Sequence, residues 1–190
     1  MKIYLLRHGE STSDVEERYG GDYEDHLTER GIVQSNELAE KLSDKAIEVI
    51  FSSPRIRAKE TAEILKGSLG CGLEIVDDLR ERNAYGILTG MVKSEAKEKY
   101  PEYVEAVKSY GDTIEGAESY EQLTERVKAC FEVLAAKPYQ IIAILTHGGV
   151  IRCFLREVIK LPELGSLGDC AVFEFEHSAD GFKMIKSCEV

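Results

Sequence analysis

Short apolar runs alternate along this chain with longer amphipathic segments, and each run stops abruptly at polar residues or glycine. The runs cover residues 3–6, 47–51, 73–76 and 141–145. Runs of this length between turn residues are typical of buried strands. Strands that alternate with helices predict a mostly parallel central sheet covered on both faces, which is a three-layer α/β/α sandwich. Residues 171–175 and 182–185 flank a turn and predict a hairpin that adds an antiparallel strand at the sheet edge.

The amphipathic segments predict the helical layers and a lid. Thr28 offers an N-cap for a helix that continues to about Ser43, and Ser119 with Gln122 matches a capping box for a helix over 119–136. Further helices are expected over 55–66, over 92–110 with a break at Pro101, and over 150–159. The expected buried stripes are Val33, Leu38, Ala39 and Leu42 in the first helix, and Ile56, Ala62 and Leu65 in the second. We interpret residues 83–118 as a helical insertion over the strand ends of a single domain spanning 1–190.

Basic side chains follow three of the predicted strands at the point where each strand ends. Arg7 and His8 follow the first run, Arg55 follows the second at the start of a helix, and His147 follows the run 141–145. Ligands bind at the carboxyl ends of the strands in open α/β sheets. Arginine has a planar donor fork suited to phosphate, and a helix N-terminus favours anions. The pattern therefore predicts an anion-binding site at this edge.

Several neighbouring residues stay ambiguous at this level. Glu81 lies in the charged loop after the third run, where it is either a general acid or one half of a salt bridge. Arg57, two residues after Arg55, is expected to point elsewhere, either as a surface arginine or at the rim of the site. The acidic residues of the loop 11–25 are expected to form a solvated face, and His26 is expected to be a surface residue.

The composition limits the partners of this chain. A formal net charge of -11 argues against nucleic acid or an anionic membrane as a partner. No apolar run approaches the roughly 20 residues that cross a bilayer, and no signal peptide follows Lys2, so we expect a cytoplasmic protein. The cysteines lack the spacing of a zinc site and are expected to be free thiols, with no metal bound. They are Cys71, Cys130, Cys153, Cys170 and Cys188.

Together these blocks resemble the histidine phosphatase superfamily, also called the phosphoglycerate mutase-like family. The resemblance rests on LLRHGES at 5–11, on Leu27-Thr28-Glu29 with Gly31 and Gln34, on SSPRIRAKETA at 52–62, on LRER at 79–82, on GAES at 116–119 and on THGGVIR at 146–152. The blocks occur in the order typical of the family and cover most of the chain. An RHG near the N-terminus combined with a late HGG and the SSP-x-x-RA-x-x-TA block makes a chance match very improbable.

The resemblance implies a phosphomonoester hydrolase that works through a phosphohistidine. His8 would attack phosphorus, and Arg7, Arg55 and His147 would surround the phosphoryl group. Glu81 would protonate the leaving oxygen and then deprotonate the hydrolytic water. Ser11, Gly148 and Arg82 are the further residues that the resemblance assigns to substrate binding. No cofactor or metal is implied, because the arginines supply the positive charge. The expected partner is a small phosphorylated metabolite, and a homodimer is left open.

Two departures from the family pattern and two alternatives accompany this prediction. Asp14 stands where many members have Asn, so that either it points away or the pocket differs. The block ERNAYG is one residue longer than the common spacing after Glu81. A 2,3-bisphosphoglycerate-dependent phosphoglycerate mutase is the first alternative. Arg82 matches it, but residues 92–118 hold no arginine for a second anion. A non-catalytic module with this fold is the second.

Overall fold

A single sheet organises the computed structural model, which describes residues 1–161 and 165–188. The six strands run in the order β3-β2-β4-β1-β5-β6. Their bounds are β1 (Lys2–Arg7), β2 (Val49–Ser52), β3 (Gly72–Ile75), β4 (Ile141–Thr146), β5 (Val172–Ser178) and β6 (Gly181–Cys188). The first four are parallel to one another, whereas β5 is antiparallel to both β1 and β6. The predicted mixed sheet with an antiparallel edge is confirmed.

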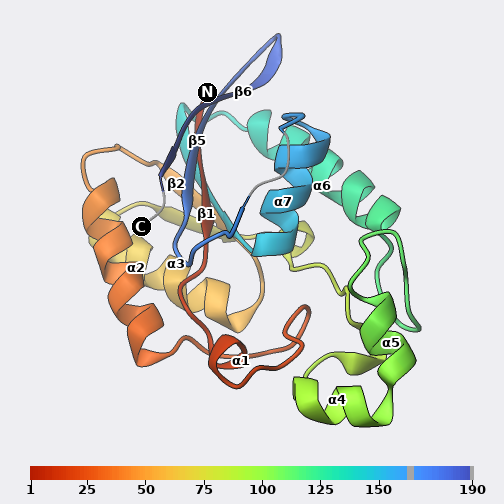
Figure 1. Cartoon of the computed structure of the whole chain (residues 1–190). Helices are drawn as coiled ribbons and strands as arrows, with labels where there is room; N and C mark the ends of the chain where they lie inside the picture. The colour runs from red at the N-terminus through yellow and green to blue at the C-terminus, as the bar shows by residue number, and fades with distance from the viewer. Residues whose placement is uncertain (162–164, 189–190) are drawn as a thin grey trace.

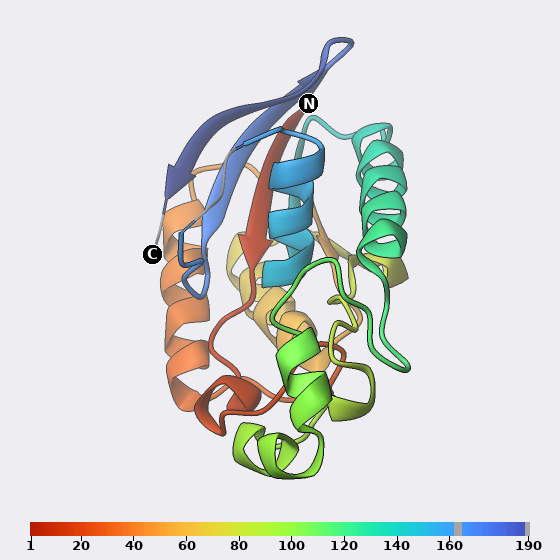
Figure 2. The same cartoon turned by 45° about the vertical axis from the view of Figure 1, so that its right-hand side comes forward.

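Helices cover both faces of this sheet (Figures 1 and 2). On one face lie α2 (Glu29–Leu42) and α3 (Ile56–Leu69), and on the other lie α6 (Tyr120–Ala135) and α7 (Gly148–Glu157). Successive side chains of a strand point to opposite faces. Accordingly Ile3 and Leu5 of β1 pack with α6 and α7, and Tyr4 packs with α2 and α3. The predicted three-layer sandwich is therefore confirmed.

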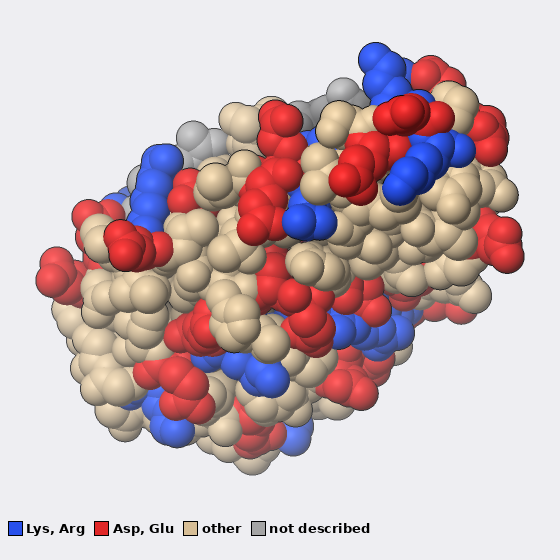
Figure 3. Space-filling view, turned by 90° about the horizontal axis from the view of Figure 1, so that it is seen from below, with Lys and Arg blue, Asp and Glu red and all other residues tan. Residues whose placement is uncertain are grey.

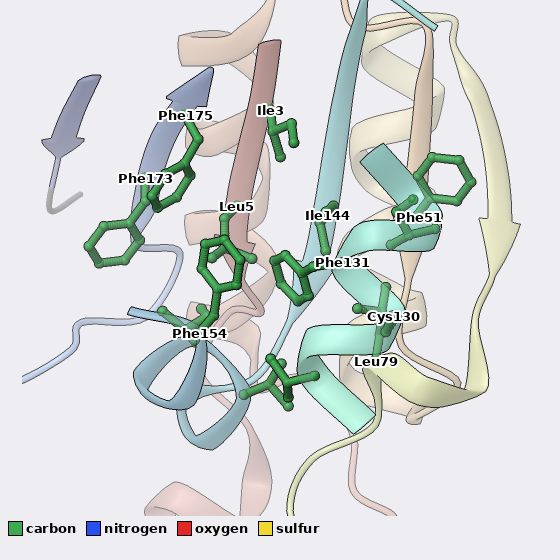
Figure 4. Close-up of a cluster of buried hydrophobic side chains, with 14 of the residues drawn as sticks. Ile3, Leu5, Phe51, Leu79, Cys130, Phe131, Ile144, Phe154, Phe173 and Phe175 are labelled. Carbon is green, nitrogen blue, oxygen red and sulfur yellow. The ribbon is translucent and has the colours of Figure 1, made fainter. Parts of the chain in front are cut away.

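The core between the sheet and α6 and α7 is the larger and the more aromatic of the two (Figure 4). The rings of Phe131 and Phe154 stack with centroids 4.1 Å apart, and Phe175 meets Phe154 edge-on at 5.3 Å. This packing fixes α7 against β1. It thereby sets the position of the residue that caps the start of α7, His147.

Helix starts follow the predicted caps, but the buried stripes are partly wrong. The Thr28 side chain accepts a hydrogen bond from the Gly31 amide, and Ser119 forms the predicted capping box with Gln122. Val33, however, is 56% exposed. The buried face of α3 also differs from the prediction, because Ile56 is only half-buried while the face consists of Arg57, Ala58, Thr61, Ala62 and Leu65.

Two segments meet at the carboxyl end of the sheet, namely the loop between β1 and α2 and the segment 83–118. The loop after β1 contains a short helix, α1 (Thr12–Val15), and the 83–118 segment contains α4 (Lys93–Lys99) and α5 (Pro101–Ala106) on either side of the predicted break. The one-turn helices η1 (Asp77–Leu79) and η2 (Gly86–Leu88) lie between β3 and α4. Backbone hydrogen bonds from Tyr19 to Met91 and from Lys93 to Glu17 join the two segments. Both lie at the lower end of the molecule in Figure 1.

No helix among residues 1–161 and 165–188 is both long enough and apolar enough to cross a bilayer.

Candidate active site

A cavity of about 550 Å³ opens at the carboxyl ends of β1 and β4. Six of the predicted site residues line it, namely Arg7, His8, Ser11, Glu81, Arg82 and Gly148, whereas His147 and Arg55 do not. Arg57, which was not predicted at the site, lines it as well. On the face of the molecule seen in Figure 3, basic side chains lie among acidic ones. The cavity therefore concentrates arginines within a protein whose net charge is -11.

His8 is buried at the end of β1 with both ring nitrogens engaged. Nδ1 lies 2.7 Å from the carbonyl oxygen of Gly9. A carbonyl only accepts, so Nδ1 carries the proton and Nε2 keeps its lone pair. Burial, and then the charges of Arg57 and Arg7, lower the pKa of His8 well below its ordinary value of 6.5. The structure thus holds a neutral imidazole with its lone pair on Nε2.

Arg57 is the arginine that faces this nucleophile. Its Nε donates a hydrogen bond of 3.2 Å to Nε2 of His8, and the residue is only 3% exposed. The expectation that Arg57 points elsewhere is wrong. The reason is the phase of α3, which places Arg57 on the same buried face as Thr61 and Leu65.

Arg55 lies outside the cavity that its sequence position suggested. It is the N-cap of α3, in extended backbone conformation, and its guanidinium pairs with Asp22 and with Glu24 at 2.6 Å. The sequence predicted a cup of Arg7, Arg55 and His147 around the phosphoryl group. The geometry corrects it, because Arg57 and not Arg55 lies beside His8.

The acidic loop follows the expectation in part: Asp14, Glu16, Glu17 and Glu24 are exposed. Asp25, by contrast, is buried against Arg57, and Asp22 binds Arg55. His26 pairs with Glu60 and is exposed, as predicted.

His147 sits under the same cup as the N-cap of α7. It is fully buried, and its ring centroid lies 4.9 Å from that of His8. Its Nε2 lies 2.7 Å from the hydroxyl of Ser53, which already accepts a hydrogen bond from the Arg55 amide. The hydroxyl has one proton and a second lone pair, and in the tautomer in which it donates to Nε2 the ring proton of His147 lies on Nδ1. Burial, and then the nearby charge of Arg57, hold the pKa of His147 well below 6.5.

Two buried donors at this site lack an acceptor within the described part of the chain. They are Nδ1 of His147 and Nε of Arg7. The other end of the Arg7 guanidinium donates to the Leu167 carbonyl at 2.5 Å and pairs with Asp169 at 3.1 Å. An unsatisfied buried donor costs roughly 1–3 kcal/mol, so native sites that keep one usually supply a ligand to it.

Glu81 reaches the cavity from the loop after η1. One carboxylate oxygen accepts from the amide of Gly149 at 3.0 Å, and the other accepts from the amide of Arg82 at 2.7 Å. A Cβ on Gly149 would overlap the Glu81 carboxylate, so any other residue at that position would displace the carboxylate. The predicted acid and the predicted nucleophile thus line one cavity although they lie far apart in the sequence.

The profile of the histidine phosphatase superfamily (branch 1) matches residues 3–188. The chain belongs to this superfamily. A metal-independent phosphoserine phosphatase of Arabidopsis thaliana is 34% identical over 177 residues, which are 90% of this chain and 74% of that protein. Phosphoglycerate mutase-like protein 4 of the same plant is 34% identical over 158 residues, 80% of this chain and 68% of that protein. The α-ribazole phosphatase of Shigella flexneri shares the fold, with a TM-score of 0.85 and 22% identity over 97% of this chain and 95% of that one.

Membership of the histidine phosphatase superfamily confirms the predicted family and enzyme class. The structure also answers one question that the family pattern raised. Asp14 lines the cavity instead of pointing away, and it accepts hydrogen bonds from the Ser11 amide and hydroxyl at 3.0 and 2.7 Å. One Asp14 oxygen lies 4.0 Å from an Arg7 nitrogen. Ser11 is therefore held in place by the residue that differs from the family pattern.

Arg82, the other predicted binding residue, is buried at the cavity wall. It is 7% exposed, and its Nε donates to the Glu118 carbonyl at 3.1 Å. No carboxylate within the described residues pairs with it at 4.0 Å or less. Nor does a group of three or more His, Cys, Asp or Glu residues that could hold a metal occur in that part of the chain. Cys71, Cys130, Cys153 and Cys170 are free thiols, and the side chain of Cys188 lies outside the described residues.

Proposed function

We propose that this protein hydrolyses phosphomonoesters through a phosphohistidine on His8. The observation that carries the proposal is the state of that side chain. It is a neutral, buried imidazole that lines the cavity and whose Nε2 accepts a hydrogen bond from Arg57, next to two buried nitrogens, Arg7 Nε and His147 Nδ1, that have no partner in the described chain. Phosphatases among the relatives support the same reaction.

Substrate binding requires one rearrangement of hydrogen bonds. The Arg57 Nε–H that now donates to His8 would transfer to a phosphoryl oxygen, which frees the Nε2 lone pair for attack. Arg7 Nε and His147 Nδ1 would donate to the other oxygens. In the transition state charge spreads over these oxygens while the ester oxygen departs, so fixed donors stabilise it more than the bound ester. The positive charge comes from arginine, and the proposed reaction needs no metal or other cofactor.

Glu81 would supply the protons. In the first step it protonates the ester oxygen as the P–O bond breaks and the Nε2–P bond forms. In the second step it removes a proton from water, whose oxygen attacks phosphorus and releases inorganic phosphate and His8. The two amide hydrogen bonds on its carboxylate keep the group at the start of α7, beside the cup.

The positive charge of Arg82 at the cavity wall favours a substrate with a second acidic group. Arg82 is buried, lines the cavity and has no carboxylate partner in the described chain. Such a cation suits a phosphorylated metabolite that also carries a carboxylate, and it is the one feature that favours the mutase alternative. The segment 92–118 contributes lysines but no arginine, which favours hydrolysis over retention of a second phosphate.

The cellular setting that we propose rests on charge. With a net charge of -11, small metabolites are favoured over nucleic acid or membrane as partners. We propose a cytoplasmic, metal-independent enzyme and leave a homodimer open.

The purified protein tests this directly. We expect hydrolysis of p-nitrophenyl phosphate in the presence of EDTA, and loss of that activity in His8→Ala. His26→Ala is the matched control, because His26 is exposed and pairs only with Glu60 outside the cavity. Rapid quenching in base should trap phosphate on His8 in the wild type. Unchanged turnover in His8→Ala would remove the nucleophile from the proposal, and efficient conversion of 3- to 2-phosphoglycerate with 2,3-bisphosphoglycerate would favour the mutase.

A further inference from the structure

The guanidinium of Arg57 is held by hydrogen bonds to the loop that precedes α2. Its Nη1 donates to the Tyr23 carbonyl at 2.8 Å and to Oδ1 of Asp25 at 2.5 Å, and its Nη2 donates to the Gly21 carbonyl at 2.9 Å. With the bond to His8, these take four of the five N–H groups. The fork is therefore fixed with its Nε edge against the nucleophile.

Asp25 is the one charged acceptor of these hydrogen bonds. Its side chain is fully buried, that of Arg57 is 4% exposed, and the second oxygen of Asp25 accepts from the Ser13 amide in α1 at 3.2 Å. Both oxygens are therefore committed, and neither reaches the cavity, whose lining contains Arg57 but not Asp25. A buried pair with this many hydrogen bonds has a defined geometry that a neutral or longer side chain would change.

We propose that Asp25 is a positioning residue, which orients Arg57 so that its Nε edge faces first the His8 lone pair and then the phosphoryl group. The inference rests on the proposed function of His8 but concerns a residue that never touches substrate. The proposal also assigns a role to the loop 20–25, because the carbonyl oxygens of Gly21 and Tyr23 accept further hydrogen bonds from the Arg57 guanidinium. Arg55 contributes from outside by pairing with Asp22 and Glu24 of the same loop.

The test compares Asp25→Asn with Glu24→Gln. Each variant removes one negative charge from the same loop, but only Asp25 touches Arg57. We expect kcat/KM for p-nitrophenyl phosphate to fall about 10- to 100-fold in Asp25→Asn, mainly through kcat, because a misplacement of about 1 Å can cost that much. Glu24→Gln should stay within about three-fold of wild type, since a half-exposed ion pair is worth little.

A spectroscopic signature separates positioning from mere stability. In protein with 15N-labelled histidine and arginine, the bond from Arg57 Nε to His8 Nε2 should give a scalar coupling between the two nitrogens in the wild type and in Glu24→Gln. In Asp25→Asn the coupling should be lost and the Nε2 signal should move toward that of a free imidazole. The affinity for inorganic phosphate, followed by the same signal, should weaken about ten-fold.

Asp25→Glu provides a variant that keeps the buried charge if Asp25→Asn does not fold. Its additional methylene should displace the guanidinium, lower kcat and shift the Nε2 signal. A folded Asp25 variant with wild-type coupling and wild-type kcat, or a wild type without the coupling, would overturn the proposal. Neither NMR result depends on turnover. An inactive wild type with the coupling intact would therefore contradict the proposed function and leave the positioning of Arg57 standing.

Discussion

Replacing each of the two arginines at the start of α3 by lysine distinguishes the structural assignment from the one that the sequence suggested. Arg57→Lys keeps a positive charge beside Asp25, so the buried carboxylate remains compensated and the fold should persist. A lysine ammonium is a single point, however. It cannot bond the loop acceptors and also present an N–H toward His8 as the planar guanidinium does.

The size of the effect follows from what the bond does in the reaction. Arg57 lies one hydrogen bond, 3.2 Å, from the nitrogen proposed to attack, and both side chains are buried. Loss of one preorganised donor to a developing oxyanion costs about 10²–10³ in kcat, or roughly 2.7–4 kcal/mol. For Arg55→Lys we expect a change within about three-fold, because its ion pairs with Asp22 and Glu24 lie outside the cavity and can also form with lysine.

Steady-state kinetics on p-nitrophenyl phosphate, with kcat and KM resolved, would measure both variants. Thermal unfolding should accompany them, so that a loss of fold is not read as a loss of catalysis. If Arg55→Lys lost 10²-fold or more while Arg57→Lys kept nearly full activity, the reasoning from the geometry would be refuted. The cup would then contain Arg55, as the sequence analysis expected.

Three further outcomes are expected. Glu81→Gln should keep its affinity for inorganic phosphate but lose about 10²–10⁴ in kcat on an alkyl phosphate. The loss should be smaller on p-nitrophenyl phosphate, because its leaving group needs no acid. Equal losses on both substrates would contradict the acid role. Gly149→Ala should lower kcat at least ten-fold, because its Cβ would overlap the Glu81 carboxylate, whereas Gly148→Ala meets its nearest atom at 3.8 Å and should stay within a few-fold. The buried, neutral His8 and His147 have pKa values well below 6.5, so the unfolded chain binds more protons below that pH. The free energy of unfolding should therefore fall as the pH drops below 6.5, by up to about 1.4 kcal/mol per pH unit for each histidine. Urea titrations between about pH 5.5 and 7.5 would measure this slope, and an unchanged slope in His8→Asn would disprove the share assigned to His8.

The sheet and the helix starts could be predicted because their causes are local. The run 141–145 is apolar on both faces, and the structure makes it the central β4. Ser119 and Gln122 form a capping box within four residues, so the start of α6 can be predicted without tertiary information. Val33 could not be placed in the same way, because which side of α2 meets the sheet depends on the packing of β1 and α3.

The acidic loop was unpredictable for a different reason. Asp22, Glu24 and Asp25 look like a solvated face in the sequence, since their partners are more than 30 residues away and carry no local signal. Charged residues in a loop are normally exposed. Only the folded chain shows that the loop folds back on α3 and that one of its carboxylates is fully buried.

The choice between Arg55 and Arg57, by contrast, could have been made from the sequence. Arg57 is a helical residue, so the face on which it lies follows from the helical period. Small or apolar residues that pack against the sheet recur from Arg57 at i+4 and i+8, at Thr61 and Leu65, and these positions are fully buried. Arg55 precedes the first helical residue and has no such phase. The arginine that shares its face with the core must be the one that reaches the strand ends, because that face is the one α3 turns toward β1 and His8.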